Sequence, residues 1–180
     1  VRLRQSLFNA LDARQRCDLI WSKLEAAGLI PELSRWLERK GESLDTLDGC
    51  QDIGMGHSVY CLTVATGYRC VVKACNDNYM LFFSQVLALF GLSSIAVNEC
   101  HTGDGNWQFS DYVSGEHVSQ CILEGRVSIA LVTQLAQQAC LGDVLGRGDR
   151  HLENYLVYKD VLYPLDVTYM FWPENETWVK

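Results

Sequence analysis

Residues 146–154 form a polar and charged segment, although apolar sequence flanks it on both sides. The preceding residues, 126–145, carry apolar side chains at the spacing of a helix. Short β-branched and aromatic runs at 155–157 and 161–163 have the composition of two strands. Binding and catalytic residues concentrate in loops that rigid elements hold in place. The sequence therefore predicts a long helix, a functional loop and a small hairpin, in that order.

Side-chain oxygens occur at three positions of this region: Asp149, Asn154 and, beyond the second short strand, Asp166. Such oxygens suit a hard cation like Mg²⁺, which takes one or two carboxylates and leaves its other positions to water and phosphate. The same residues could instead cap turns, because Asp and Asn favour turns through local hydrogen bonds. The pattern alone leaves both interpretations open.

The remainder of the chain changes from helical to strand-like spacing. Residues 1–45 have apolar positions at helical spacing, and strand-like sequence begins near residue 44. One segment with the length and composition of a buried helix, 79–90, interrupts the strand-like region. This order predicts an α+β arrangement of two lobes, with five strands in the first. After the first strand, the others are predicted at 58–64, 68–74, 94–101 and 107–113.

A Gly-x-Gly sequence, Gly54 to Gly56, joins two of the predicted strands and is followed by Ser58. Glycines let backbone N–H groups approach phosphates without interference from a Cβ atom. The next strand carries Lys73 inside an apolar run, where an ammonium group is costly to bury without an anionic partner. Each signal is weak alone, since Val59 replaces the third glycine of a fuller pattern and a lysine can reach the surface.

The order of these features resembles the catalytic core of atypical protein-kinase-like phosphotransferases. The order runs from glycine loop to strand lysine, a hinge-like segment at 109–113, a long helix, Asp-x-x-x-x-Asn and a further Asp. The spelling Gly148-Asp149-Arg150-His151-x-x-Asn154 is most similar to the phosphatidylinositol 3/4-kinase branch. The resemblance covers residues 47–171, about two-thirds of the chain. In its short length the chain is similar to compact bacterial effector kinases.

The resemblance implies a two-lobed protein-kinase-like fold with a small antiparallel sheet in the N-lobe and a reduced helical C-lobe. The implied domains are an N-terminal helical extension at 1–45, an N-lobe at 46–113 and a C-lobe at 114–180. The N-lobe would carry the glycine loop and the strand lysine. The C-lobe would carry the catalytic loop and the metal-binding Asp.

The family also implies roles for individual residues. In such kinases the strand lysine pairs with the ATP phosphates, the loop Asp handles the acceptor hydroxyl, and the Asn and final Asp hold Mg²⁺. These roles would fall to Lys73, Asp149, Asn154 and Asp166, while His151 would support the catalytic loop or contact the transferring phosphate. Hinge backbone groups would meet the adenine. The implied nucleotide-binding residues are Gly54, Gly56, Ser58, Lys73, Asp111 and Val113.

Three features depart from the family pattern. The predicted helix at 79–90 contains no Glu or Asp to pair with Lys73, so only Gln85, or Asp77 just before it, could substitute. The usual Asp-Phe-Gly reads Asp-Val-Thr from Asp166 onwards, which keeps the metal ligand and loses the glycine hinge. Only 14 residues follow Asp166, so the sequence indicates either a minimal kinase or a fragment.

Charge and composition narrow the choice of partner. The net charge of −7 argues against a general nucleic-acid binder, and 48% hydrophobic with 21% charged residues excludes a disordered chain. A phosphoinositide headgroup would call for Lys or Arg near the transfer site, yet Lys180 is the only basic residue after Asp166. The sequence therefore favours an ATP- and Mg²⁺-dependent kinase for Ser or Thr of a protein. The alternatives are a phosphoinositide or lipid kinase, a pseudokinase that binds nucleotide, and an α+β protein without chemistry.

Eight cysteines occur without any Cys-x-x-Cys pair, which argues against a structural zinc site. Many lie in apolar runs, where a free thiol behaves as a small hydrophobic side chain. No apolar run is long enough to cross a bilayer, and no signal-peptide pattern opens the chain. These features predict free thiols and a cytoplasmic protein, in a host cytoplasm if the chain is a delivered effector. The even cysteine count and the sequon at Asn175 leave a secreted, disulfide-bonded form as the alternative.

Overall fold

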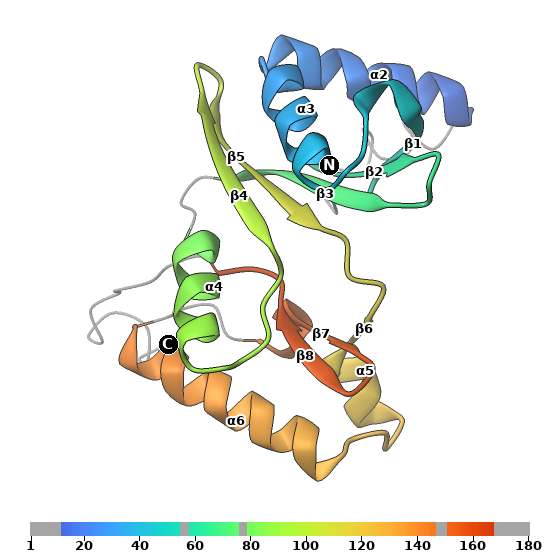
Figure 1. Ribbon diagram of the computed structural model, residues 1–180. Coiled ribbons are helices and arrows are strands. Elements are labelled where there is room, and N and C mark those ends of the chain that lie inside the picture. The colour runs from blue at the N-terminus through green and yellow to red at the C-terminus, as the bar shows by residue number, and fades with distance from the viewer. Residues whose placement is uncertain (1–11, 55–57, 76–78, 147–150, 168–180) are drawn as a thin grey trace, which may run out of the picture. The chain divides into compact units, whose positions relative to one another are not determined.

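The computed structural model describes residues 12–54, 58–75, 79–146 and 151–167 (Figure 1). The chain divides into two compact units. Unit 1 comprises Val1–Asn76 and Asn98–Tyr112, and unit 2 comprises Asp77–Val97 and Val113–Lys180. The helices predicted as a separate extension therefore belong to unit 1, whereas the helix inserted among the strands belongs to unit 2.

Unit 1 is built on a five-stranded sheet with the strand order β1-β2-β3-β5-β4. The pairs β1–β2, β2–β3 and β3–β5 are antiparallel. The central strand, β3, carries the predicted lysine, Lys73. The strands are β1 (Leu47–Asp52), β2 (Val59–Val64), β3 (Arg69–Cys75), β4 (Val97–Thr102) and β5 (Gly105–Asp111).

Two helices, α2 (Ala13–Ala26) and α3 (Ile30–Arg39), pack on one face of this sheet. Asp12 starts α2 through a capping box with Gln15, and a short 3₁₀ turn, Leu44–Thr46, follows α3. Because successive strand residues point to opposite faces, Lys73 lies on the face that α2 and α3 leave uncovered. The buried sheet residues in the core shared with the helices are Tyr60, Leu62, Val64, Cys70, Val72, Cys100, Trp107 and Phe109.

Unit 2 combines helices with a three-stranded sheet in the order β6-β7-β8. The Ser128 hydroxyl starts its longest described helix by accepting the Leu131 N–H at 3.1 Å. One buried cluster surrounds Phe83, and a second surrounds Leu131 and Leu162. The elements are α4 (Met80–Leu89), β6 (Glu116–His117), α5 (Val118–Leu123), α6 (Ile129–Val144), a 3₁₀ turn (Leu152–Asn154), β7 (Tyr155–Tyr158) and β8 (Val161–Pro164).

The predicted α+β class is confirmed, as is the order of helices, five strands with one inserted helix, a long helix and a hairpin. The structure adds β6 and α5, which the sequence did not predict. All eight cysteines are free, and four of them are buried. Within the described ranges, no helix has the length and apolar character needed to cross a bilayer.

Candidate functional site

Lys73 lies in β3 opposite Val59 of β2 and Gln108 of β5. Its side chain is half-buried, and the register places it on the same sheet face as Gln108. Gln108 is only 6% exposed, so a buried polar side chain accompanies the lysine. The Cys75 thiol lies 3.9 Å from the Gln108 Oε1 atom. The strand lysine therefore has polar neighbours on a strand that is otherwise largely apolar.

The predicted glycine loop runs from β1 to β2. The Asp52 carboxylate accepts a hydrogen bond from the Gly54 N–H at 3.0 Å, which forms an Asx turn at the start of the loop. At the other end, the Ser58 carbonyl accepts a hydrogen bond at 2.9 Å from the N–H of Ala74, the residue after Lys73. The structure thus brings the end of the loop and the strand lysine together within unit 1.

Asp111, at the end of β5, is held by side chains from two other elements. Its carboxylate accepts a hydrogen bond from the Lys40 ammonium group at 2.8 Å and another from the Tyr68 hydroxyl at 2.7 Å. The Tyr68 oxygen in turn accepts the indole N–H of Trp36 at 3.1 Å. Burial and the adjacent Asp111 carboxylate raise the pKa of Tyr68. The hydroxyl therefore stays protonated and continues to donate to Asp111.

The next two residues, Tyr112 and Val113, contact other parts of the chain. The Tyr112 N–H donates to the Arg69 carbonyl at 3.1 Å, and the Arg69 guanidinium lies 3.6 Å from the centre of the Tyr112 ring. This cation–π contact and the backbone bond attach Tyr112 to the start of β3. Val113 is half-buried and packs against the cluster around Phe83 in unit 2.

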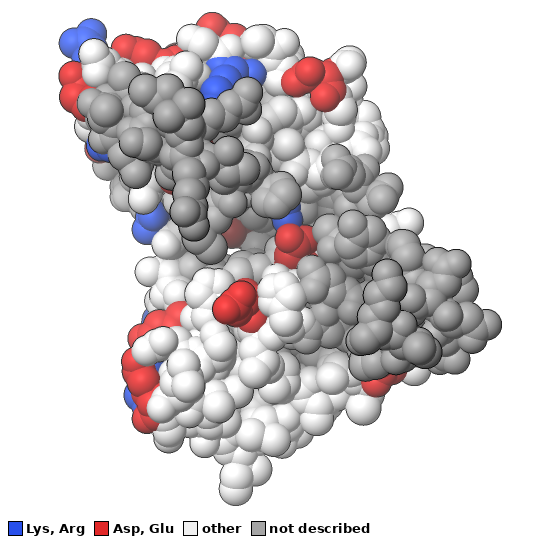
Figure 2. Space-filling view, turned by 180° about the vertical axis from the view of Figure 1, so that it is seen from behind, with Lys and Arg blue, Asp and Glu red and all other residues white. Residues whose placement is uncertain are grey.

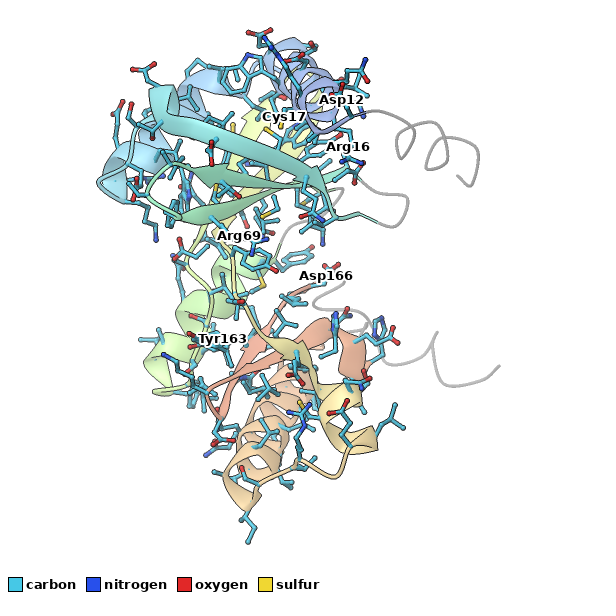
Figure 3. The ribbon with its side chains drawn as sticks, turned by 90° about the vertical axis from the view of Figure 1, so that its right-hand side faces the viewer. Asp12, Arg16, Cys17, Arg69, Tyr163 and Asp166 are labelled. Carbon is cyan, nitrogen blue, oxygen red and sulfur yellow. The ribbon has the colours of Figure 1, made fainter. Side chains whose placement is uncertain are left out.

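Asn154 and Asp166 lie at the same end of the β7–β8 hairpin. The Leu165 N–H donates to the Asn154 carbonyl at 2.9 Å, extending the register in which Tyr155 faces Pro164. Asn154 is only 8% exposed, and Asp166, labelled in Figure 3, is half-buried. The hairpin therefore brings together the two predicted metal ligands, which are 12 positions apart in the sequence.

A 3₁₀ turn before β7 holds the backbone at Asn154 in place. The Asn154 N–H donates to the His151 carbonyl at 3.0 Å, and the His151 side chain is exposed. On the neighbouring strand, the His117 Nδ1–H donates to the Glu153 carbonyl at 2.8 Å. His117 thus connects β6 to the residue immediately before Asn154. Sequence reasoning missed it, because no local pattern marks a histidine whose partner is 36 positions away.

An amide and a carboxylate oxygen suit Mg²⁺, which completes its coordination with water and phosphate oxygens. Within the described residues, no group of three or more His, Cys, Asp or Glu side chains could hold a metal ion. The side-chain oxygens of Asn154 and Asp166 are of the kind that suits a hard cation whose other ligands are water and phosphate.

Three sequence-predicted positions, Gly56, Asp77 and Asp149, lie outside the described residues. Their roles, like those of the other predicted site residues, stay predictions. Gln85, the other residue considered as a partner for Lys73, lies on α4 in unit 2 and is exposed.

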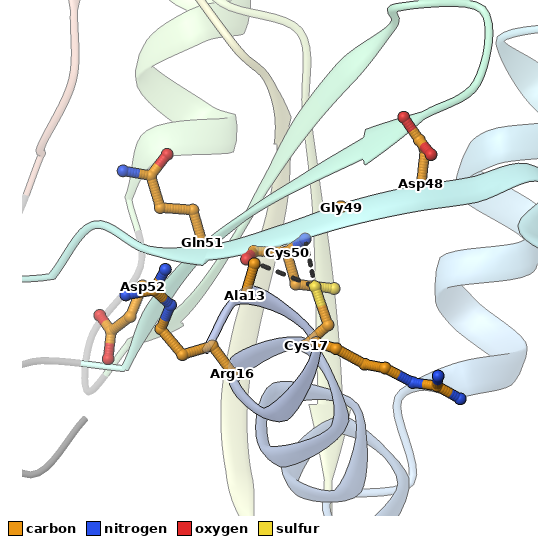
Figure 4. A pocket seen from close by; sticks show the side chains of 9 residues that line it. Ala13, Arg16, Cys17, Asp48, Gly49, Cys50, Gln51 and Asp52 are labelled. Atoms are coloured by element: carbon orange, nitrogen blue, oxygen red, sulfur yellow. Dashed lines mark hydrogen bonds between the residues drawn. The ribbon is translucent and has the colours of Figure 1, made fainter. Parts of the chain in front are cut away.

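A cavity of about 590 Å³ in unit 1 lies between the start of α2 and β1 (Figure 4). Cys17 and Cys50 both line this cavity, and the Cys17 sulfur accepts a hydrogen bond from the Cys50 N–H at 2.9 Å. Burial and the neighbouring Cys17 raise the pKa of Cys50 to about 12, so this thiol is protonated at neutral pH. None of the predicted site residues that the structure describes lines this cavity. One lining residue, Asp52, accepts the Gly54 N–H with its carboxylate.

No family model matches the sequence, and no curated protein matches it. Comparison with solved structures finds protein-kinase domains. The kinase domain of maize sucrose-induced receptor kinase 1 bound to AMP-PNP has 15% identity and a TM-score of 0.45, over 70% of this chain and 53% of that one. The Cydia pomonella granulovirus kinase PK-1 has 20% identity and a TM-score of 0.48, over 74% of this chain and 55% of that one.

The kinase domain of M. tuberculosis PknI has 16% identity and a TM-score of 0.37, over 66% of this chain and 54% of that one. The chain thus spans about half the length of these three kinase domains. These similarities do not assign an activity to this chain.

Proposed function

We propose that the protein is an ATP- and Mg²⁺-dependent kinase that transfers the γ-phosphate to a hydroxyl group. The observation that carries this proposal is the backbone hydrogen bond from Leu165 to Asn154. It holds an amide and a carboxylate, Asn154 and Asp166, at one end of a hairpin, in the order and spacing of the kinase motif. When bound there, Mg²⁺ would neutralise charge on the phosphates.

Lys73 and the glycine loop would bind the phosphates of ATP. A lysine ammonium is a compact positive charge suited to phosphate oxygens, and the backbone N–H groups of the loop add further donors. The hydrogen bond between Ser58 and Ala74 supports this assignment, because it fixes the loop beside the lysine strand. Asp111 and Val113 would border the adenine through backbone groups of their segment.

Asp149 would accept the proton of the acceptor hydroxyl and orient that group for attack. Its position five residues before Asn154 agrees with the Asp-x-x-x-x-Asn spacing of the kinase motif. His151 would support this loop, because its carbonyl already accepts the Asn154 N–H. The exposed imidazole of His151 could also meet the transferring phosphate.

A Ser or Thr hydroxyl of a protein is the acceptor that we favour. In the described part of unit 2, the basic residues are Arg126 and Lys159. Arg126 forms ion pairs with Glu116 and Glu124, and Lys159 lies 5.0 Å from the ring centre of Tyr158 in the hairpin turn. Among the described residues of the face in view in Figure 2, the Lys and Arg atoms form small, separate groups. A polyanionic lipid headgroup calls for several such side chains near the transfer site, and Arg126 and Lys159 already contact neighbouring side chains.

A nucleotide-binding pseudokinase is the second candidate, and one observation favours it. Helix α4 contains no acidic residue among Met80–Leu89. Active kinases use an ion pair between the strand lysine and a helix glutamate. Binding without transfer is the expected outcome if nothing replaces that carboxylate.

Incubation with γ-labelled ATP and Mg²⁺, alone and with cell lysate or phosphoinositide vesicles, separates these candidates. Label in protein supports the favoured function, label in lipid supports the lipid alternative, and nucleotide binding without transfer supports the pseudokinase. Asp166→Asn should abolish transfer. The control is Asp18→Asn, which makes the same exchange on the exposed surface of α2, away from the site, and should leave transfer unchanged. Full transfer by Asp166→Asn would refute the assigned metal ligand.

A further inference from the structure

Helix α3 is connected to the end of β5 by charged and polar side chains. Lys40, the C-cap residue of α3, donates to Asp111 at 2.8 Å, and its ammonium group also lies 4.7 Å from the ring centre of Trp36. Trp36 is buried at 4% exposure within the helix–sheet core. The position of the Lys40 side chain is therefore set by the packing of α3 as well as by its bond to Asp111.

Tyr68 makes the second connection. Its ring packs against the same core, and its hydroxyl accepts from Trp36 while donating to Asp111. Lys40 and Asp111 expose 26% and 33% of their side chains, so the ion pair is partly shielded from water. A charge-assisted bond in such surroundings is stronger than one on an open surface. Asp111 is thus held by two donors with fixed positions.

The residue after Asp111 is fixed by a separate pair of contacts. Tyr112 is bonded through its N–H to the Arg69 carbonyl and stacked against the Arg69 guanidinium. The side chains of two successive residues are therefore held by α3, by Tyr68 and by the start of β3. Together with the sheet pairing of Asp111 and Cys70, these contacts hold the backbone of this segment in place.

We propose that Lys40 and Tyr68 are positioning residues for nucleotide binding. They fix Asp111, and through it the backbone groups that would meet the adenine. Helix α3, which the kinase resemblance does not cover, would then be part of the support of the nucleotide site. This inference rests on the proposed function, since it assumes that the segment from Asp111 borders ATP. Backbone groups that are already held in the bound position reduce the conformational entropy lost on binding, so loosening them weakens affinity.

The test compares Lys40→Met, Lys40→Arg and Tyr68→Phe with the parent. Lys40→Met keeps the length of the stem and removes the charge, while Lys40→Arg keeps the charge and should restore the parent's affinity. Lys23→Met is the matched control, because Lys23 lies 5.6 Å from the ring centre of Tyr60 in the same unit and away from Asp111. Each variant is measured for the Kd of Mg·ATP, for KM against kcat, and for thermal unfolding.

Lys40→Met should raise Kd and KM for ATP roughly tenfold with kcat little changed, and Tyr68→Phe should act in the same direction. Lys40→Arg and Lys23→Met should bind as the parent does. If Lys40→Met fails to fold, Tyr68→Phe, which keeps the ring, decides the question. An unchanged Kd and KM in Tyr68→Phe and in any folded Lys40→Met refutes the positioning role, even when Tm falls. A folded parent that binds no Mg·ATP refutes the proposed function itself, a result distinct from the variants' behaviour.

Discussion

Gly115, the residue before β6, is predicted to tolerate no side chain. A Cβ atom placed there would lie 2.7 Å from the Val157 carbonyl oxygen and 3.2 Å from the Leu156 Cβ. The first of these atoms belongs to the backbone of β7 and cannot rotate aside. Overpacking of this kind typically costs about 1–3 kcal/mol, while a glycine-to-alanine change returns up to about 1 kcal/mol by restricting the unfolded chain. We therefore expect Gly115→Ala to lower the free energy of unfolding by roughly 1–2 kcal/mol.

Urea unfolding followed by circular dichroism measures this difference, and Gly103→Ala supplies the matched control. Gly103 has no heavy atom within 4 Å of an added Cβ and does not have a positive φ. Its replacement should leave stability unchanged or slightly raised. Because β6 also carries His117, whose ring bonds the Glu153 carbonyl, Gly115→Ala should reduce phosphotransfer as well. A Gly115→Ala protein as stable as Gly103→Ala would refute the close approach of this residue to β7.

Three further predictions concern the phosphate-binding lysine, the acceptor and a buried thiol. Lys73→Met should lose most phosphotransfer while keeping the Tm of the parent; normal turnover would make Lys73 a structural residue. Asp149→Asn should bind Mg·ATP like the parent in a calorimetric titration and transfer about 10²–10⁴-fold more slowly, and an unchanged transfer rate would count against a role in deprotonation. Burial, with smaller contributions from Cys61 and Asp111, raises the pKa of Cys70 from 9.0 to about 12. The unfolded thiol therefore releases its proton first, so stability should fall by about 1.4 kcal/mol per pH unit as pH rises from about 9 towards about 12. Urea unfolding of Cys70→Ala should show a correspondingly smaller dependence over that range, and equal slopes would contradict the shift.

Local periodicity was sufficient to predict most of the elements. The helix expected at 126–145 is found at Ile129–Val144, and it starts late because the Ser128 hydroxyl caps its first turn. The inserted helix at 79–90 is found at Met80–Leu89. Strand β6, by contrast, has two residues, and it exists only because Glu116 and His117 pair with β7, about 40 positions later. No window of sequence contains that information.

Some positions in the candidate site follow from local sequence, whereas others depend on contacts between residues far apart in the chain. Asn154 and Asp166 lie near each other because they flank one short hairpin, and the register of that hairpin alone brings them together. Asp111 was predicted only as a hinge residue with a backbone role. Its carboxylate has partners 71 and 43 positions away, Lys40 and Tyr68, on elements that reach it through the packing of the core.

Lys40 and Tyr68 do not lie at any fixed spacing from the motif that they would support. A kinase-like motif therefore identifies the groups that would contact substrate, whereas the groups that orient them have to be found in the structure. This difference explains why Lys40, which lies outside the region of family resemblance, is the residue whose replacement tests the site most independently of the motif. If Lys40→Met weakens Mg·ATP binding and Lys40→Arg does not, the assignment of a nucleotide site at Asp111 no longer depends on the resemblance.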